Sequence, residues 1–217
     1  GTAVDTFTLG HNVTGTVAGG DGNDSFDVNA GTLSNIDGDA GTDTLDLAGL
    51  AALTVTLTGV NNPNGFAGSV STNVTNFADM NTIIGTGGTD SLIGRNATST
   101  FTITAANDTY QDAGTLVTLT LQDFDNFTGG TGIDTFDLTG NHTGNLSGGS
   151  GNDIVNLDAG TLTGAVAGDA GNDTFNLNGG MVSGAVVGGD GTADTLVGST
   201  AYTVTGLNSG TQAQVGS

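Results

Sequence analysis

The sequence predicts an all-β chain that folds as a parallel β-helix, or β-solenoid, of about 19–20-residue coils. Three observations predict this fold. A Gly- and Asp-containing motif recurs along the chain, short runs of alternating apolar and polar residues follow its copies, and forty glycines stand beside a single proline. Alternation with a period of two is typical of strands that bury one face. We expect a single solenoid domain over residues 1–217, as a segment of a longer repetitive protein or filament.

The motif is a glycine-rich turn followed by a shared Asp. Its copies begin at Gly19, Gly38, Gly85, Gly129, Gly148, Gly168 and Gly188, and their shared residues are Asp24, Asp43, Asp90, Asp134, Asp153, Asp173 and Asp194. Successive shared Asp residues lie 19, 47, 44, 19, 20 and 21 residues apart, and a truncated copy places Asp5 in the same position. The two long gaps predict double coils whose middle turn lacks the motif.

Each coil is expected to contain two short strands separated by a glycine-bearing turn. The best-preserved copies carry their inward positions at Val155, Leu157, Leu162, Gly164, Val166 and at Phe175, Leu177, Val182, Gly184, Val186. A strand pair this short cannot bury its apolar face alone. Stacked copies can, because each strand pairs with its equivalent about 4.8 Å above and below. We therefore expect continuous internal ladders of Phe, Leu and Val, with Phe66 and Phe77 as packing residues.

The charge pattern indicates a cation site at the turns. All twenty-two acids are Asp, against one base, Arg95, and no Lys, for a net charge of -21. Stacked Asp side chains would lie roughly 5 Å apart, which either raises their pKa values or requires a cation between them. Calcium suits a carbonyl-rich loop better than magnesium does. Turn glycines permit positive φ and supply carbonyl ligands; the candidates are Gly22, Gly41, Gly132, Gly151 and Gly171.

The turn sequences GGDGNDSFD from Gly19 and GGSGNDIVN from Gly148 resemble the calcium-binding nonapeptide of RTX proteins. The spacing differs, because RTX β-rolls carry the nonapeptide on both edges, whereas this chain carries it about every twenty residues. The chain is therefore similar to the one-edged calcium solenoids of large repetitive bacterial adhesins. This resemblance implies Ca²⁺ ligands at Asp24, Asp43, Asp134, Asp153 and Asp173, and extends to Asp90 and Asp194, which follow a shortened motif and an extra residue, Ala193.

A metal-free alternative remains for the same residues. Asn-Asp and Gly-Asp pairs favour tight turns and can hydrogen-bond their own backbone. Beside the motif, Asp21, Asp39, Asp169 and Asp190 are expected to be solvated turn residues, and Asp27, Asp46 and Asp137 to face water. The histidines, His11 and His142, do not repeat with the motif and are expected to be surface or half-buried variation.

Several function classes are disfavoured. An acidic surface repels nucleic acid, no segment has the apolar length of a membrane span, and no signal-peptide pattern precedes the repeats. We expect no enzyme activity and no catalytic residues, because the only fixed base is Arg95 and the acids recur as a ladder rather than as one paired site. The lack of Cys leaves metal as the available cross-link.

The expected function is structural. The chain is interpreted as a calcium-stabilised stalk or fibre segment of an extracellular or surface-bound bacterial adhesin or biofilm matrix protein. Its expected partners are calcium ions and neighbouring repeats or identical subunits end to end, with a surface or glycan receptor left unnamed. Two alternatives are a head-to-tail filament subunit and an ice-binding solenoid, the latter weakened because only one outward turn column, at Asn23, Thr42, Thr89, Ile133, Asn152 and Asn172, is regular.

Overall fold

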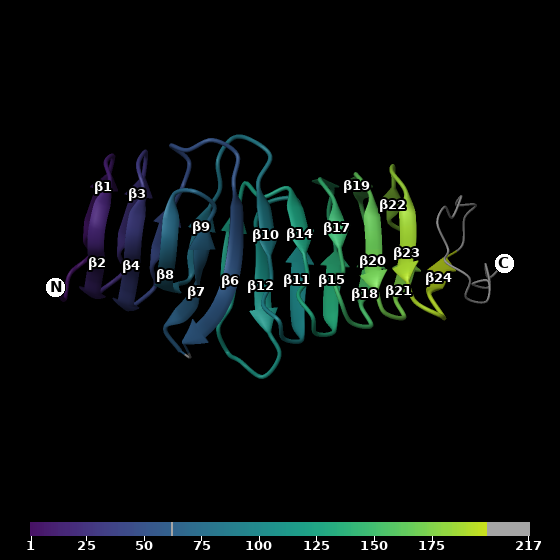
Figure 1. Ribbon diagram of the computed structural model, residues 1–217. Helices are drawn as coiled ribbons and strands as arrows, with labels where there is room; N and C mark the ends of the chain where they lie inside the picture. Colours follow the sequence, from purple (N-terminus) through teal and green to yellow (C-terminus); the bar gives the residue numbers. More distant parts are fainter. Residues whose placement is uncertain (62, 199–217) are drawn as a thin grey trace. The chain divides into compact units, whose positions relative to one another are not determined.

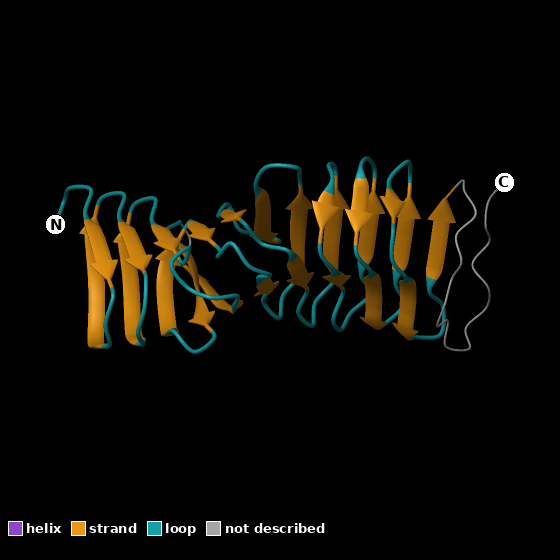
Figure 2. Cartoon of the chain, turned by 90° about the horizontal axis from the view of Figure 1, so that it is seen from above, coloured by secondary structure: helices purple, strands orange, loops and turns teal. Residues whose placement is uncertain are grey.

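The computed structural model describes residues 1–61 and 63–198. Every regular element in this part of the chain is a β-strand, and Figure 2 shows strands joined by loops. Among these residues there is accordingly no helix with the length and hydropathy needed to cross a membrane. The chain divides into two compact units, Gly1–Ile93 with Thr109–Phe124 and Gly94–Asp108 with Asp125–Ser217.

The first unit is built on two largely parallel sheets (Figure 1). One has the order β1-β3-β5-β9-β13-β12, with bounds β1 Thr6–Leu9, β3 Ser25–Val28, β5 Thr44–Asp46, β9 Thr82–Ile84, β13 Leu119–Gln122 and β12 Asp108–Asp112. The other has the order β2-β4-β8-β7-β6-β10, with bounds β2 Val13–Asp21, β4 Leu33–Ala40, β8 Val74–Met80, β7 Gly65–Val70, β6 Thr54–Asn61 and β10 Ser91–Ile93.

Register in the first unit follows the motif spacing. Phe7 pairs with Phe26, and Phe26 with Leu45, each 19 residues further along the chain. Leu45 then pairs with Ile83, and Ile83 with Leu121. Phe26, Leu45 and Ile83 are each 0 % exposed. The apolar ladder predicted from the alternation is thus confirmed, and burying each of these side chains contributes about 1.5–3 kcal/mol.

The double coil predicted between Asp43 and Asp90 is wrong. Thr44 pairs directly with Thr82, and the intervening chain forms β6, β7 and β8, with β6–β7 and β7–β8 antiparallel. The sequence explains this locally, because Asn64-Gly65 lies between two runs of strand-forming residues and favours a tight turn. We call β6, β7 and β8 the inserted meander. Phe66 and Phe77 are packing residues in it, at 0 % and 2 % exposure.

The second unit has three sheets, one more than the two strands per coil that we predicted. Their orders are β11-β15-β18-β21-β24, β14-β17-β20-β23 and β16-β19-β22. The first comprises β11 Ser99–Ile103, β15 Asp134–Leu138, β18 Ile154–Leu157, β21 Thr174–Leu177 and β24 Thr195–Gly198. The second comprises β14 Asn126–Thr128, β17 Leu146–Ser147, β20 Val166–Ala170 and β23 Val186–Asp190, and the third β16 His142–Thr143, β19 Thr161–Thr163 and β22 Met181–Val182.

The strand pairs described in these three sheets are all parallel, and equivalent residues are stacked. Phe101 pairs with Phe136, Phe136 with Val155, and Val155 with Phe175. The rings of Phe101 and Phe136 stack with centroids 4.5 Å apart. The additional strand arises because Leu162 and Val166, which the alternation predicts on one strand, lie on two different strands, β19 and β20.

Candidate functional site

The shared Asp residues are buried, and they lie at or just before the first strand of their coil. Exposure is 2 % or less for Asp24, Asp43, Asp134, Asp153 and Asp173, and 7 % for Asp194. Side chains of this kind are almost never fully buried unless they are paired. We call these six carboxyl groups, two in a column of the first unit and four in a column of the second, the Asp ladder.

One carboxylate oxygen of each ladder residue has a fixed role. In Asp24, Asp43, Asp153, Asp173 and Asp194 the Oδ1 atom accepts a hydrogen bond from the main-chain N–H of the equivalent residue one coil earlier. The donor–acceptor pairs are Asp5–Asp24 at 2.7 Å, Asp24–Asp43, Asp134–Asp153 and Asp153–Asp173 at 2.8 Å, and Asp173–Asp194 at 3.0 Å. Backbone hydrogen bonding is therefore one function of the ladder, but each bond joins residues 19–21 positions apart, whereas the metal-free alternative expects turn residues to bond their own backbone.

The second carboxylate oxygen is different. In Asp24, Asp43, Asp153 and Asp173 the Oδ2 atom is buried and accepts no hydrogen bond. Leaving such a group unsatisfied costs about 1–3 kcal/mol, and more when it is charged. Hydrogen bonding to the main chain therefore accounts for only one of the two oxygen atoms in each of these four carboxylates.

At five of the six ladder residues, a main-chain carbonyl oxygen of the next coil and the Oδ2 atom both lie beside the first glycine of the motif. A Cβ built on Gly148, for example, would lie within 3.0 Å of both Asp153 Oδ2 and the Gly168 carbonyl oxygen. The same holds at Gly19, Gly129 and Gly168, with the carbonyls of Gly38, Gly148 and Gly188, and at Gly38 with the carbonyl of Asp79. The ladder is thus accompanied by a column of carbonyl oxygens that sequence reasoning missed, although the first glycine of each motif marked it.

Burial disfavours the charged form of the ladder. Desolvation, with the neighbouring charges of Asp24, Asp79 and Asp39, raises the pKa of Asp43 to about 6. Desolvation, with the charges of Asp134, Asp173 and Asp169, raises the pKa of Asp153 to about 7.

The pKa of Asp173 is also raised, first by burial and then by Asp194 and Asp169. Near neutral pH these carboxyl groups must therefore either hold a proton or be neutralised by a cation.

In each unit the ladder ends beside a residue whose side-chain polar atoms are hydrogen-bonded, Asn81 in the first unit and Ser99 in the second. In the first unit the next position after Asp43 is Asn81, whose Oδ1 accepts the Asp43 N–H at 2.8 Å. Its amide nitrogen donates to the Asn64 carbonyl at 2.9 Å, where a ladder Asp would present a bare oxygen. In the second unit Ser99 precedes Asp134 and donates its hydroxyl to Asp134 Oδ1, while Gly130 N–H donates to Asp134 Oδ2 at 2.8 Å.

The five predicted glycine ligands form columns of their own. They stack on one another, so that a Cβ on Gly41 would overlap the Gly22 carbonyl oxygen, and one on Gly151 would overlap that of Gly132. Gly171 stands in the same way over Gly151. These carbonyl oxygens lie against the next glycine of the column, and this close approach explains why the fourth motif position is glycine.

Asp90 lies outside the Asp ladder. Its motif leads into β10, which pairs with β6 of the inserted meander rather than with a ladder strand. Leu53 N–H donates to Asp90 Oδ1 at 2.8 Å, and Thr86 N–H donates to Asp90 Oδ2 at 2.5 Å. Both carboxylate oxygens are satisfied by the main chain, so the fit to a cation is poorer here than in the ladder.

Asp194 keeps its ladder position despite the extra residue, Ala193. The N–H groups of Thr192 and Ala193 both donate to Asn172 Oδ1, each at 3.0 Å. The corner therefore absorbs the insertion, and Asp173 N–H still reaches Asp194 Oδ1.

Outside the ladder, exposed Asn side chains cap the corners. Asn23 Oδ1 accepts the N–H of Thr42 at 2.9 Å, and Asn152 Oδ1 that of Asn172 at 2.8 Å. These Asn residues cap the following coil, whereas the ladder Asp residues cap the preceding one. The half-buried His142 is not surface variation alone: its Nε2 lies 2.7 Å from the Asp125 carbonyl oxygen, and its ring lies 5.4 Å from that of Phe127.

The ladder has the oxygen chemistry of a hard-cation site: an unsatisfied carboxylate oxygen at Asp24, Asp43, Asp153 and Asp173, and beside each of them a carbonyl oxygen from the next coil. The described residues hold no group of three or more His, Cys, Asp or Glu side chains gathered around one point. Main-chain carbonyls and water would therefore supply most of the ligands of any ion bound here. With main-chain carbonyls and water as the remaining ligands, the ladder residues fit calcium.

Comparison with known proteins adds no family to this description. A scan of family models, a search of curated proteins and a search of solved structures each gave no match. The functional argument therefore rests on the ladder itself.

Proposed function

We propose that the chain is a β-solenoid whose Asp ladder binds calcium ions, and that it serves as a stiff stalk or fibre segment of an extracellular bacterial adhesin or biofilm matrix protein. The observation that carries the proposal is the set of buried, unsatisfied Oδ2 atoms at Asp24, Asp43, Asp153 and Asp173. A solenoid is supported by parallel registers that advance by one motif spacing, 19 residues at Phe7–Phe26 and 20 at Val155–Phe175.

Calcium is favoured over a proton because the ladder repeats. A proton neutralises one carboxyl group, whereas a divalent ion between coils neutralises two and links them. The chain has no Lys that could do the same. Calcium takes flexible shells of carboxylate, carbonyl and water oxygens, as the ladder and its carbonyl column offer. When bound, the ion would supply positive charge and coil-to-coil cross-links, and the ladder residues would hold it through Oδ2.

A structural role is favoured over catalysis because the polar interior repeats. Asp153 and Asp173 have the same burial, the same hydrogen bond and the same unsatisfied oxygen. A catalytic site requires one singular arrangement of groups, whereas a repeated arrangement serves each coil alike. Calcium dependence also fits a location outside the cell, where modules bind calcium at about 10⁻⁴–10⁻³ M.

The test is a circular dichroism titration of the chelator-treated chain with calcium and, separately, magnesium. We expect the β signal and the Tm to rise with calcium and much less with magnesium. Asp153→Asn should weaken the response, whereas Asp27→Asn, on the half-buried outer side of β3, should leave it unchanged. Full, calcium-insensitive β structure in chelator would refute the calcium ladder.

One observation favours the ice-binding alternative. The sheet containing β1 carries an unbroken outward column of hydroxyl side chains, Thr6, Ser25, Thr44, Thr82 and Thr120. In the second unit Ile154 interrupts the corresponding column. A thermal-hysteresis measurement tests this alternative: activity that Thr44→Tyr abolishes would favour it, and no activity in the calcium-loaded chain would remove it.

A further inference from the structure

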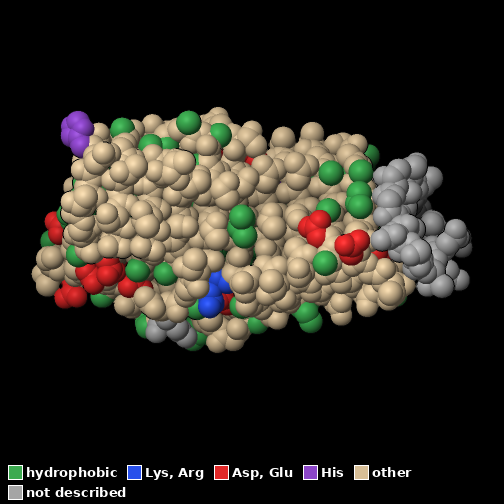
Figure 3. Space-filling model, viewed as in Figure 1, with side chains coloured by type: hydrophobic (Ala, Val, Ile, Leu, Met, Phe, Trp, Pro, Cys, Tyr) green, Lys and Arg blue, Asp and Glu red, His purple; other side chains and the backbone are tan. Residues whose placement is uncertain are grey.

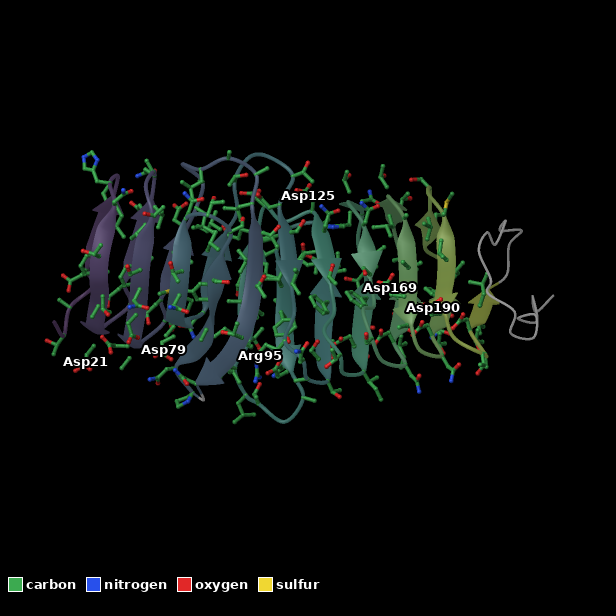
Figure 4. All side chains as sticks on the ribbon, in the orientation of Figure 1. Asp21, Asp79, Arg95, Asp125, Asp169 and Asp190 are labelled. Atoms are coloured by element: carbon green, nitrogen blue, oxygen red, sulfur yellow. The ribbon has the colours of Figure 1, made fainter. Side chains whose placement is uncertain are left out.

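A second acidic cluster lies on the first unit, where the inserted meander joins the regular coils. Strand β8 pairs in parallel with β4, and Asp37 is directly opposite Ala78. The residue after Ala78 is Asp79, labelled in Figure 4. Figure 3 shows acidic side chains gathered on this face near the N-terminal end of the first unit. The Asp ladder does not explain the side chain of Asp79, because Asn81 occupies the ladder position of this coil.

Asp79 has an unusual backbone. Its φ is 59°, in the left-handed region that non-glycine residues seldom occupy. Gly65 of β7 packs directly against it, since a Cβ on Gly65 would lie 2.5 Å from the Asp79 carbonyl carbon and 2.7 Å from Met80 nitrogen. The turn of the meander therefore holds Asp79 in place. Strained conformations of this kind persist where the surrounding structure enforces them and are enriched at functional sites.

The Asp79 carboxyl group is buried and incompletely satisfied. The residue is 7 % exposed, and its Oδ1 atom is buried without a hydrogen-bond partner. Asn61 of β6 hydrogen-bonds to the carboxyl group, and the side chain of Asp37 lies within hydrogen-bonding range of it. Burial first, and then the charges of Asp37 and Asp39, raise the pKa of Asp79. Two facing carboxyl groups need a proton or a cation between them.

The neighbours of the pair are also acidic or neutral. Asp37 Oδ1 accepts the Asp39 N–H, and Asp39 Oδ2 accepts the Gly20 N–H, both at 3.1 Å. Asp39 adds negative charge without joining the pair. The chain contains no Lys that could neutralise this charge. The local field therefore attracts cations.

The geometry points to a divalent-cation site between the carboxyl groups of Asp37 and Asp79, distinct from the Asp ladder, that fastens the inserted meander to β4. Because no third acidic side chain completes the shell in the described residues, the ion keeps several waters. Both magnesium and calcium bind in this way through one or two carboxylates. Its ligands lie 42 residues apart, so the ion closes the whole insertion as a loop. The inference does not rest on the ladder.

Ion stoichiometry tests the site. Equilibrium dialysis with radioactive calcium, repeated with manganese, would compare the wild-type chain with Asp37→Asn, Asp79→Asn and Asp123→Asn. Asp37→Asn is the primary variant, because the Asp79 carbonyl also faces ladder residue Asp43. Asp123 is the matched control: its φ is 58°, and its carbonyl faces Gly85 as that of Asp79 faces Gly38, but its side chain is exposed.

We expect Asp37→Asn and Asp79→Asn each to bind one ion fewer than wild type, with Asp123→Asn unchanged. Hydrogen exchange over residues 65–80 should slow on ion addition in wild type and not in the two variants. Equal stoichiometry in all four chains would overturn the site and leave a shared proton as the explanation. A variant that failed to fold would not end the test: manganese should broaden the amide resonances of Gly38 and Ala78 in wild type, and unbroadened resonances would overturn it.

A failed ladder would look different. In that case wild type would bind a single ion, which Asp37→Asn removes and Asp153→Asn does not. If the ladder binds and this site does not, Asp153→Asn alone lowers the stoichiometry.

Discussion

The regular coils of the second unit and one coil of the first unit cap the same corner with different side chains. We call the latter, which contains the inserted meander, the interrupted coil. In the regular coils, Asp153 accepts the N–H of Asp134 and Asp173 that of Asp153, and each leaves one carboxylate oxygen unsatisfied. In the interrupted coil, Asn81 caps the N–H of Asp43 and satisfies its second group by donating to Asn64. The turn itself therefore accepts a neutral side chain. The recurrence of Asp has to be explained by something else that the carboxylate binds.

The largest effect on stability is expected at a glycine of the regular coils that has no space for a side chain. Gly171→Ala should cost several kcal/mol, because the added Cβ would overlap the carbonyl oxygen of Gly151. Gly59→Ala in the inserted meander is the matched control, since its Cβ would only touch that of Ala67, at 3.4 Å. Urea unfolding of both variants with calcium present measures the difference. Equal stability would mean that the glycine column is not closely stacked.

The double variant Asp153→Asn/Asp173→Asn tests whether the ladder can be made like the interrupted coil. In chelator we expect stabilisation of about 1–3 kcal/mol per site, because the buried charge is removed and the N–H cap is kept. In calcium the advantage should vanish or reverse, since the ion loses two carboxylates. Tm measurements in both buffers give the answer, and lower stability in chelator would contradict the comparison with Asn81.

The pH dependence of stability distinguishes the metal-free ladder from the calcium-bound ladder. A carboxyl group whose pKa is raised by folding binds its proton more tightly in the folded chain, so the metal-free chain should lose stability as pH rises. For Asp43 and Asp153 the loss begins near pH 4 and ends at about 6 and 7, respectively. The slope is about 1.4 kcal/mol per pH unit per group.

With calcium the sign reverses, because protons compete with the ion, and stability should rise with pH over the same interval. Thermal unfolding at pH 5, 6, 7 and 8, in chelator and in calcium, measures both slopes. Parallel slopes in the two buffers would show that no ion binds the ladder.

The smallest effect is expected from Asn81→Asp, which extends the ladder into the interrupted coil. The variant loses the hydrogen bond to Asn64 and gains a bare oxygen, so its stability in chelator should fall by about 1–3 kcal/mol. Calcium should recover part of the loss. Isothermal titration calorimetry would detect the added binding, and an unchanged calcium response would indicate that the interrupted coil lacks the other ligands.

The parts of this fold and site that the sequence predicts are those that repeat. The spacing of Asp134, Asp153 and Asp173 predicts parallel stacking, and the alternation after each predicts the apolar ladder. The motif before Asp90 predicts a ladder position for it. The strand that follows, β10, instead pairs with β6 of the inserted meander, which the motif does not reveal. Asn81 has no motif around it, so its ladder position emerges only from the register of β9.

The direction of the turn carbonyls is not predicted by the sequence, for a related reason. Sequence chemistry indicates that turn glycines can present carbonyls, but it does not say in which direction. The structure turns the carbonyls of Gly132 and Gly151 along the column and brings those of Gly148 and Gly168 to the carboxylates. Direction depends on φ at successive positions, which pattern alone leaves open.

The corner at Ala193 has a consequence for how such a gene can change. One added codon there is absorbed, because Asn172 accepts both neighbouring N–H groups and Asp194 stays in column. The same codon inside a strand would reverse every later side chain on it. Coils can therefore differ in length at their corners without changing the register of their strands, and spacings of 19, 20 and 21 residues coexist between Asp134 and Asp194.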